Sequence, residues 1–180
     1  MLAQNQNIEL LLAQCKLQNQ KAQFAVYNLY SAAMYNVAFR ILGNQNEAEN
    51  IMQDSFLKAF TKIETYKHEA TFGAWLKKIV INKSINELKK TKAYITETIT
   101  ENFENIPARD DDTFFTNQKV AHVLKTIQSL KPNYRVILTL FFIEGYDLEE
   151  ITIILKISYP NCRTTMSRAK ESLRQKLHTI

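Results

Sequence analysis

The sequence predicts an all-α protein, built as two small helical domains joined by an acidic linker. Only three glycines and three prolines occur among 180 residues, whereas sheet proteins of this size normally need more turn residues. Hydrophobic residues make up 46% of the chain, which is enough to form real cores. Apolar residues recur at helical spacing in both halves of the chain. These three observations favour helices packed on helices.

Charge is distributed unevenly along the chain. Residues 1–95 carry 12 Lys and Arg against 7 Asp and Glu, residues 96–118 carry 1 against 6, and residues 119–180 carry 10 against 5. The connector 96–118 contains Pro107 and the run Asp110–Asp112, and it shows no sustained helical stripe. We therefore expect domains over 1–95 and 119–180, with an extended acidic linker between them. Two basic blocks suit a polyanionic partner without proving one.

The residue types present disfavour several classes of site. Cys15 and Cys162 are the only cysteines and the three histidines are scattered, so we expect no metal site and two free thiols in a reducing cytoplasm. No nucleophile with a base and no glycine-rich phosphate loop occurs, so we expect no catalytic residue, no cofactor and no enzyme activity. The amino end does not resemble a signal peptide, and no stretch is apolar enough to span a bilayer. A soluble cytoplasmic protein without membrane insertion is expected, and the role of the first 15 residues stays open.

The first domain is expected to contain three helices. The first runs over 17–42, where Phe24, Leu29 and other apolar residues recur at helical spacing, and Gly43 ends it. Asn44 or Asn46 caps the second helix. Its core face is predicted to hold Ile51, Phe56, Ala59, Phe60 and Ile63. Beside that face lie Asn50, Gln53, Asp54 and Leu57, called here the 50–57 strip. On pattern alone, plain surface is its commoner interpretation.

The third helix follows a loop over 64–71 and is the most basic element of the chain. Its buried side is predicted to hold Phe72, Trp75, Leu76, Ile79, Val80 and Leu88. Aromatic residues stand next to cations here, with Tyr66, His68, Phe72 and Trp75 beside Lys67, Lys77 and Lys78. A lysine-solvated surface helix is the plain alternative. Stacking faces beside a basic groove are also what unpaired bases need, since each aromatic–base stack contributes about 1–3 kcal/mol.

The second domain is expected to end in a helix-turn-helix. A helix over 120–130 stops before Pro132, which opens the next helix, and Gly145 ends that one. Asp147 with Glu150 forms a close variant of the capping box for a short helix over 148–156. A turn at Ile157–Ser158 leads into the last helix. Many helical hairpins share this plan and contact no DNA, so the plan alone does not distinguish a DNA-binding domain from a packing unit.

The last helix has two different faces. A core stripe is formed by Cys162, Met166, Ala169, Leu173 and Leu177. Facing away from it are Arg163, Thr164, Ser167 and Arg168, called here the 163–168 face. They lie in the amino-terminal half, from which recognition helices contact bases. Ser158 is expected to cap this helix, which leaves Pro160 in the tolerant first turn.

Taken together, the two halves resemble an extracytoplasmic-function sigma factor of bacterial RNA polymerase, which keeps regions 2 and 4. Region 2 is matched by "YNVAFRILGNQNEAENIMQDSFLKAF" and "TFGAWLKKIVINKSINELKK". Region 4 is matched by "LKPNYRVILTLFFIEGYDLEEITIILKIS" and "SRAKESL". The resemblance spans roughly residues 15–177. It implies a protein that binds core RNA polymerase and promoter DNA, with an anti-sigma factor as a further partner.

The resemblance also assigns roles to residues. In region 2 it makes the 50–57 strip the polymerase-binding surface, which reverses the plain-surface interpretation. It gives recognition and melting of the −10 element to the loop and basic helix, through Tyr66, Lys67, His68, Trp75, Lys77, Lys78 and Asn82. Tyr66 and Asn82 stand where the family holds a flipped-out base, which costs a few kcal/mol to extrude. In region 4 it gives the −35 element to Arg163, Thr164, Ser167 and Arg168.

The chain departs from the family pattern at a few positions. The family usually has an acid at Asn50, a basic residue near Phe141, and Gly-Thr-Val at 160–162. It commonly has arginine at Thr165. At Thr165 we expect the loss of a phosphate or packing contact and an intact helix. The departures bear mainly on the affinity for the −35 element and on the sequence of that element.

Two other functions stay open at this point. A helix-turn-helix regulator that acts without polymerase would leave the 50–57 strip and the aromatic cluster without a role. A scaffold protein with a merely solvating basic surface would show no salt-dependent DNA binding. Transcription with purified core polymerase separates all three.

Overall fold

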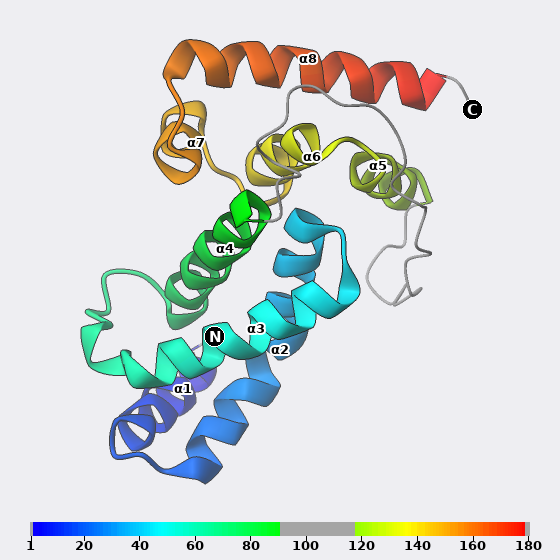
Figure 1. The fold of residues 1–180 in the computed structure, drawn as a ribbon. Helices are drawn as coiled ribbons and strands as arrows, with labels where there is room; N and C mark the ends of the chain where they lie inside the picture. Colours follow the sequence, from blue (N-terminus) through cyan, green and yellow to red (C-terminus); the bar gives the residue numbers. More distant parts are fainter. Residues whose placement is uncertain (1, 91–117, 179–180) are drawn as a thin grey trace. The chain divides into compact units, whose positions relative to one another are not determined.

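The computed structural model describes residues 2–90 and 118–178, and of residues 2–7 only the backbone. Within these residues every regular element is a helix, as the sequence predicts (Figure 1). The chain divides into two compact units, Met1–Asn86 and Glu87–Ile180. Nearly all of the predicted linker 96–118 lies outside the described residues, so the limits of the domains stay predictions. No described helix is both long and apolar enough to cross a membrane.

The first unit begins with a helix that the sequence interpretation did not include. Helix α1 spans Leu2–Lys16, and α2 (Gln20–Leu42) packs against it. Leu12 and Cys15 of α1 are buried. The helix predicted over 17–42 is therefore shorter at its amino end, where the Asn19 side chain accepts hydrogen bonds from the backbone N–H groups of Lys21 and Ala22. Gly43 ends α2 in the left-handed conformation, with φ 75°, as predicted.

Helix α3 (Gln45–Thr61) follows at once and packs along α2. Of the two predicted caps, Asn44 is the one used, and its side chain accepts a hydrogen bond from the Glu47 N–H. A short 3₁₀ turn, Ile63–Thr65, leads into an irregular loop and then into α4 (Phe72–Lys90). The elements of this unit thus carry the 50–57 strip on α3 and the basic residues on α4.

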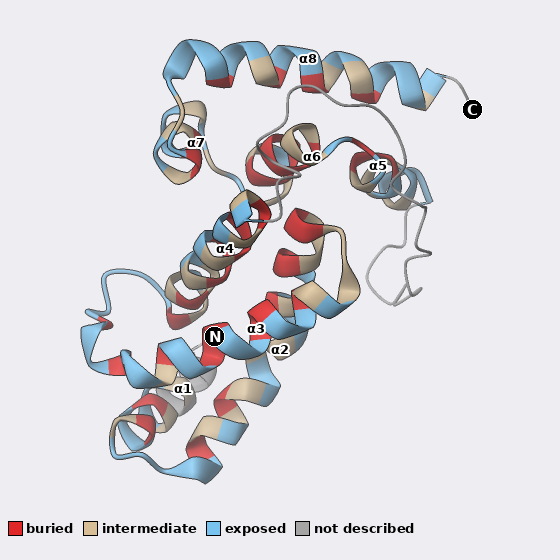
Figure 2. Ribbon diagram, viewed as in Figure 1, coloured by how far each residue is buried: buried red, intermediate tan, exposed pale blue. Residues whose placement is uncertain are grey.

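The core of the first unit differs in part from the predicted one. Phe24 and Leu29 are exposed, and the buried residues of α2 instead include Val26, Val37 and Ile41. Figure 2 shows the buried residues in red. On α3, Phe60 is only half-buried, and on α4 so are Trp75 and Ile79. The buried side chains of α4 that the prediction omitted include Ile81 and Ile85. The helix is buried over a wider arc than a single stripe indicates.

The second unit contains α5 (Gln118–Gln128), α6 (Pro132–Leu138), α7 (Leu148–Leu155) and α8 (Tyr159–His178). Pro132 stands in the first turn of α6, as predicted. The single helix predicted after Pro132 instead continues as a π-helical turn, Thr139–Ile143. Helix α8 packs across α5, α6 and α7 and carries its buried residues along one side (Figure 2).

Local signals set the geometry of the helix-turn-helix. The Asp147 side chain accepts a hydrogen bond from the Glu150 N–H at 2.8 Å, and the Glu150 carboxylate accepts one from the Asp147 N–H at 2.9 Å. This is the predicted capping box of α7. Lys156 takes a left-handed conformation, with φ 58°, and turns the chain. Ser158 Oγ then accepts the Asn161 N–H at 3.4 Å, which caps α8 as predicted.

The stripe of α8 is confirmed in its first four members. Cys162, Met166, Ala169 and Leu173 are buried, whereas Leu177 near the end is half-buried. Both cysteines of the chain are free and buried. Burial raises the pKa of the Cys162 thiol above its ordinary value, which keeps it protonated.

Candidate functional site

The 50–57 strip lies on an exposed face of α3. Asn50, Gln53, Asp54 and Leu57 stand at i, i+3, i+4 and i+7, so one helical face carries all four. Each is exposed, and Leu57 leaves 67% of its surface open to solvent. The buried residues of α3 are Ala48, Ile51, Met52, Ser55, Phe56 and Ala59. The structure therefore brings the predicted strip together and keeps it out of the core.

Two contacts orient the polar side chains of the strip. Gln53 Nε2 donates a hydrogen bond to Glu49 Oε1 at 3.3 Å, within α3. Lys83 Nζ on α4 donates to Asp54 Oδ2 at 3.1 Å, which also makes an ion pair between the two helices. Sequence reasoning missed this second contact because the two residues stand 29 positions apart. The carboxylate of Asp54 is thus held by a neighbouring helix and still faces solvent.

Tyr66 does not lie where a stacking surface requires it. The sequence interpretation offers its ring to a flipped-out base, but only 8% of Tyr66 is exposed. Its hydroxyl donates to the Ala70 carbonyl oxygen at 2.7 Å, which closes the loop 66–71. Burial raises the pKa of Tyr66 above its ordinary value of 10.0, and nearby Tyr30 and Glu9 raise that pKa further. In this structure Tyr66 therefore shapes the loop from inside.

The aromatic cluster under the loop explains that burial. The Tyr66 ring lies 4.4 Å from the ring of His68, 5.6 Å from Phe72 and 5.5 Å from Trp75, measured between centroids. Tyr30 of α2 contacts Phe72 edge-on at 5.6 Å. Such aromatic pairs contribute about 0.5–1.5 kcal/mol beyond the area they bury. The cluster fixes the start of α4 against α2.

Tyr30 is a residue of this site that sequence reasoning missed. Gly73 gives the one local signal for it, because an isolated glycine inside a helix often has a packing reason. A Cβ atom at Gly73 would lie 2.9 Å from Cε1 of Tyr30, so any side chain there forces the tyrosine to move. The glycine leaves room for the Tyr30 ring against the start of α4 beneath the loop.

The outer side of the loop and helix carries the polar candidates. Lys67 and His68 are exposed in the loop, and His68 has a left-handed backbone with φ 60°. On α4, Trp75, Lys78 and Asn82 lie within about 60° of one another around the helix axis. Lys78 and Asn82 are exposed and Trp75 is half-buried. These residues form a continuous face with stacking, cationic and amide groups.

Lys77 is turned away from that face. It stands about 140° around the helix from Asn82, and it is half-buried whereas Lys78 is exposed. Adjacent lysines in the sequence therefore point in different directions. The predicted grouping of Lys77 with Lys78 and Asn82 is not what the structure brings together.

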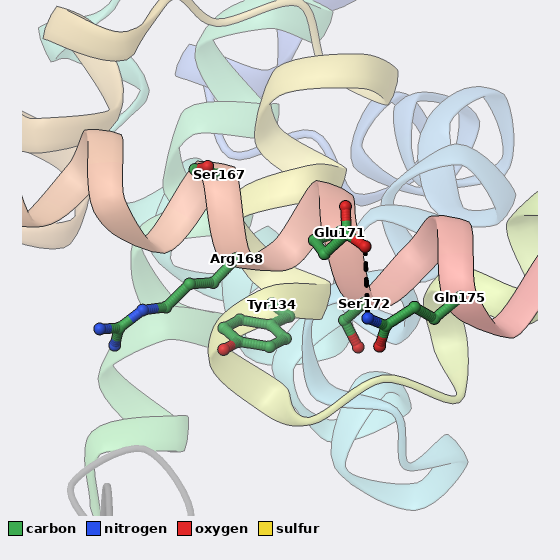
Figure 3. A pocket seen from close by; sticks show the side chains of 6 residues that line it. All are labelled: Tyr134, Ser167, Arg168, Glu171, Ser172 and Gln175. Carbon is green, nitrogen blue, oxygen red and sulfur yellow. Dashed lines mark hydrogen bonds between the residues drawn. The ribbon is translucent and has the colours of Figure 1, made fainter.

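The 163–168 face is exposed on α8. Arg163, Thr164, Ser167 and Arg168 all lie on the solvent side of the helix. A shallow hollow of about 480 Å³ lies beside Ser167 and Arg168, and α6 contributes Tyr134 to it (Figure 3). A second hollow, of about 460 Å³, is lined by Tyr159, Pro160, Arg163, Thr164 and Ser167. The face thus presents two cations flanking hydroxyl groups, a set suited to phosphates and base edges.

The residues that depart from the expected pattern have definite contacts here. Thr164 Oγ1 donates to the Pro160 carbonyl oxygen at 2.9 Å, whereas Thr165 Oγ1 donates to the side-chain oxygen of Asn161 at 3.1 Å. The family pattern has a basic residue near Phe141, which this chain lacks at that place. Helix α8 instead brings Lys170 Nζ to 5.1 Å from the centroid of the Phe141 ring. A positive charge is therefore present near Phe141, supplied by another helix.

Comparison with known proteins decides what these surfaces belong to. The family model "Sigma-70 region 2" matches residues 26–94, and "Sigma-70, region 4" matches residues 122–173. The sigma factor SigV of Bacillus subtilis is 30% identical over 150 residues, which cover 79% of this chain and 83% of SigV. The chain belongs to the extracytoplasmic-function sigma factors. Sigma factors are regulatory proteins and not enzymes.

Further relatives show how much of this sigma factor the likeness covers. SigW of Bacillus subtilis is 28% identical over 180 residues, covering 94% of this chain and 96% of SigW. SigE of Mycolicibacterium smegmatis is 28% identical over 147 residues, covering 80% of this chain. The chain spans only 57% of the length of that longer relative.

Solved structures show the same fold. The neighbours include CnrH in complex with the cytosolic domain of CnrY, with a TM-score of 0.54, 21% identity, and 94% and 96% of the two chains covered. They also include RpoE in complex with the anti-sigma factor NepR from Bartonella quintana, with a TM-score of 0.57, 20% identity, and coverage of 86% and 95%. All the candidate residues of this sigma factor fall inside the two matched regions. Helix α1 and the connector do not contribute to them.

Proposed function

We propose that this sigma factor binds core RNA polymerase through the 50–57 strip and directs initiation by contacting both promoter elements. Loop 66–71 and the outer face of α4 melt and read the −10 element, and the 163–168 face of α8 reads the −35 element. The observation that carries the proposal is that the 50–57 strip and the 163–168 face are exposed, as are Lys67, His68, Lys78 and Asn82, and that all of them lie within the regions that the family models match. The three roles need three separate surfaces, and the chain offers them.

For the −10 element, the proposal gives the residues different tasks. Trp75 and His68 offer rings at the surface, on which an extruded base can stack. Asn82 offers an amide for hydrogen bonds to a base edge, and Lys67 and Lys78 attract phosphates. Tyr66 acts as a positioning residue, since its ring lies under the loop and its hydroxyl holds Ala70. This division replaces direct stacking on Tyr66.

Two further parts of the proposal concern partners and place. Both structural neighbours named above are complexes, with CnrY and with the anti-sigma factor NepR. We extend this to the present chain as a protein partner that binds it and blocks its access to polymerase. Its place of action is the cytoplasm, where polymerase and chromosome are present.

Transcription in vitro with purified core polymerase tests the proposal. With core polymerase and a pool of genomic promoters, the chain alone should confer initiation at specific sites. Arg168→Ala should lower initiation that depends on the −35 element and leave polymerase binding intact. Arg174→Ala is the matched control, since Arg174 is an exposed arginine on the same helix beyond its reading half.

The alternative functions give different results. The double variant Gln53→Ala, Asp54→Ala should bind core polymerase weakly while its helical content stays unchanged. A regulator that acts without polymerase would bind DNA specifically and show no affinity for core polymerase. A chain that binds neither polymerase nor DNA would rule the proposal out.

A further inference from the structure

Two residues of α8 that depart from the family pattern are joined by one hydrogen bond. Thr165 Oγ1 donates to Asn161 Oδ1 at 3.1 Å, between exposed or half-exposed side chains. The neighbouring threonine behaves differently, because Thr164 Oγ1 donates to the backbone carbonyl of Pro160, four residues earlier. Bonding to that carbonyl is the usual choice for a helical threonine. Thr165 instead orients a side chain.

The position of Asn161 and Thr165 on α8 indicates a contact with DNA. Asn161, Thr165 and Arg168 stand at i, i+4 and i+7 on α8, within about 60° around the helix axis. The three residues form one row along α8, and Arg168 belongs both to this row and to the 163–168 face. Asn161 lies in the first turn, and recognition helices contact base edges from their amino-terminal residues. The pair therefore extends the 163–168 face toward the start of the helix.

The side chain of Asn161 is not needed to hold the helix. Ser158 Oγ already accepts the backbone N–H of Asn161, which supplies the cap. The described structure gives the amide of Asn161 one contact, the hydrogen bond from Thr165. A side-chain amide has two acceptor sites on its oxygen and two N–H donors. After Thr165 has taken one acceptor site, one acceptor site and both donors stay open to solvent.

The free acceptor site and N–H donors of the Asn161 amide match the edge of one base in the major groove. Adenine presents an N6 amino donor beside the N7 acceptor, and a side-chain amide pairs with both at once. We propose that Asn161 reads an adenine of the −35 element, and that Thr165 is its positioning residue. The hydroxyl of Thr165 holds the amide oxygen and so selects which end of the amide donates. This inference rests on the proposed function of α8.

A promoter library with a randomised −35 element tests the assignment. Holoenzyme made with the natural sigma factor should favour adenine at one position, and Asn161→Ala should reduce that preference about tenfold with other positions unchanged. Asn161→Asp should shift the preference at the same position toward cytosine, because a carboxylate accepts from the cytosine N4 amino group and cannot donate to N7.

Thr165 is tested by isosteric variants. Thr165→Val removes the hydroxyl and keeps the branched shape, so it should weaken the same adenine preference, by less than Asn161→Ala. Thr165→Ser should keep most of the preference. When Asn161 is already alanine, Thr165→Val should have no further effect on base choice, because the side chain that it orients is gone.

The outcomes separate this inference from the proposed function. Unchanged base preferences in Asn161→Ala, with −35 reading still lost in Arg168→Ala, would overturn the inference and leave the proposed function standing. Uniform weakening at all sequences with a smaller salt dependence would also overturn it, since that result identifies a phosphate contact. A natural holoenzyme with no −35 preference would contradict the proposed function itself.

Discussion

Lys83 Nζ on α4 lies 3.1 Å from Asp54 Oδ2 on α3, so the basic helix is paired with the 50–57 strip. The lysine is the more covered partner, with 24% of its side chain exposed against 61% for the aspartate. Exposed ion pairs of this kind contribute about 0–1 kcal/mol to stability. The pair therefore matters more for the direction of the Asp54 carboxylate than for the fold.

Asp54→Asn should weaken binding to core polymerase and lower the free energy of unfolding by less than about 1 kcal/mol. The reason is that the carboxylate faces solvent on the strip and makes one ion pair among the described residues, with Lys83. Lys83→Gln is the matched control, because it breaks the same pair and keeps the carboxylate. Titration of labelled core polymerase measures the affinity of both variants. Equal loss of affinity in the two variants would show that the pair, and not Asp54 alone, is the binding group.

Tyr66→Phe should loosen loop 66–71 with little effect on the rest of the first unit. It removes the hydrogen bond to the Ala70 carbonyl, whose net contribution is about 1 kcal/mol, and keeps the ring in its cluster. Promoter opening should slow, while affinity for core polymerase stays the same. Permanganate footprinting of unpaired thymines measures the opening. If opening is unchanged, the loop does not depend on this hydroxyl.

Much of this fold could be predicted because the deciding signals are local. Gly43, Asp147 and Ser158 act through their own backbone conformation or through hydrogen bonds to residues three positions away. The core stripe of α8 also follows from spacing alone. Helix α1 was not predicted, although Ile8, Leu11, Leu12 and Cys15 stand at the i, i+3, i+4 and i+7 spacing of one helical face.

What could not be predicted depends on contacts between elements. Tyr66 looks like a surface aromatic in the sequence, because Tyr30 of α2 stands far from it along the chain. In the structure Tyr30 contacts Phe72 of the same cluster and lies near enough to raise the pKa of Tyr66. In the sequence Lys83 cannot be told from the other lysines of α4, and only the packing of α3 brings Asp54 beside it. The residues of the candidate site were thus predictable as a set, whereas the roles of individual members depend on packing.

The stability of the first unit should fall at alkaline pH. Burial raises the pKa of both Tyr30 and Tyr66 above the ordinary value of 10.0. The stability these tyrosines contribute is fully present below pH 10.0 and is lost as the pH rises through their raised pKa values, because the unfolded chain releases the protons first. Urea unfolding across this range should show a smaller loss in Tyr66→Phe. An identical loss in both proteins would assign the effect to other groups.

Lys78→Gln should weaken non-specific DNA binding, whereas Lys77→Gln should have a much smaller effect. Lys78 is exposed on the same face of α4 as Asn82, and Lys77 is half-buried on another side. Loss of one phosphate contact reduces the slope of log affinity against log salt concentration by about 0.9 on duplex DNA. Fluorescence anisotropy at several salt concentrations measures the slope. Equal changes in the two variants would mean that binding depends on total charge and not on the face.

Asp147→Ala should destabilise the second unit and reduce reading of the −35 element together. It removes one half of the capping box of α7, which costs about 1 kcal/mol. Helix α7 packs against α8, so a frayed α7 leaves the 163–168 face less well held. Glu149→Ala is the control, since Glu149 is an exposed acid in the same first turn whose side chain is not part of the capping box.

Urea unfolding and transcription from promoters with and without a −35 element measure the two effects of Asp147→Ala. Binding to core polymerase through α3 should survive in both variants, and its loss in Asp147→Ala would mean that the second unit contributes to polymerase binding.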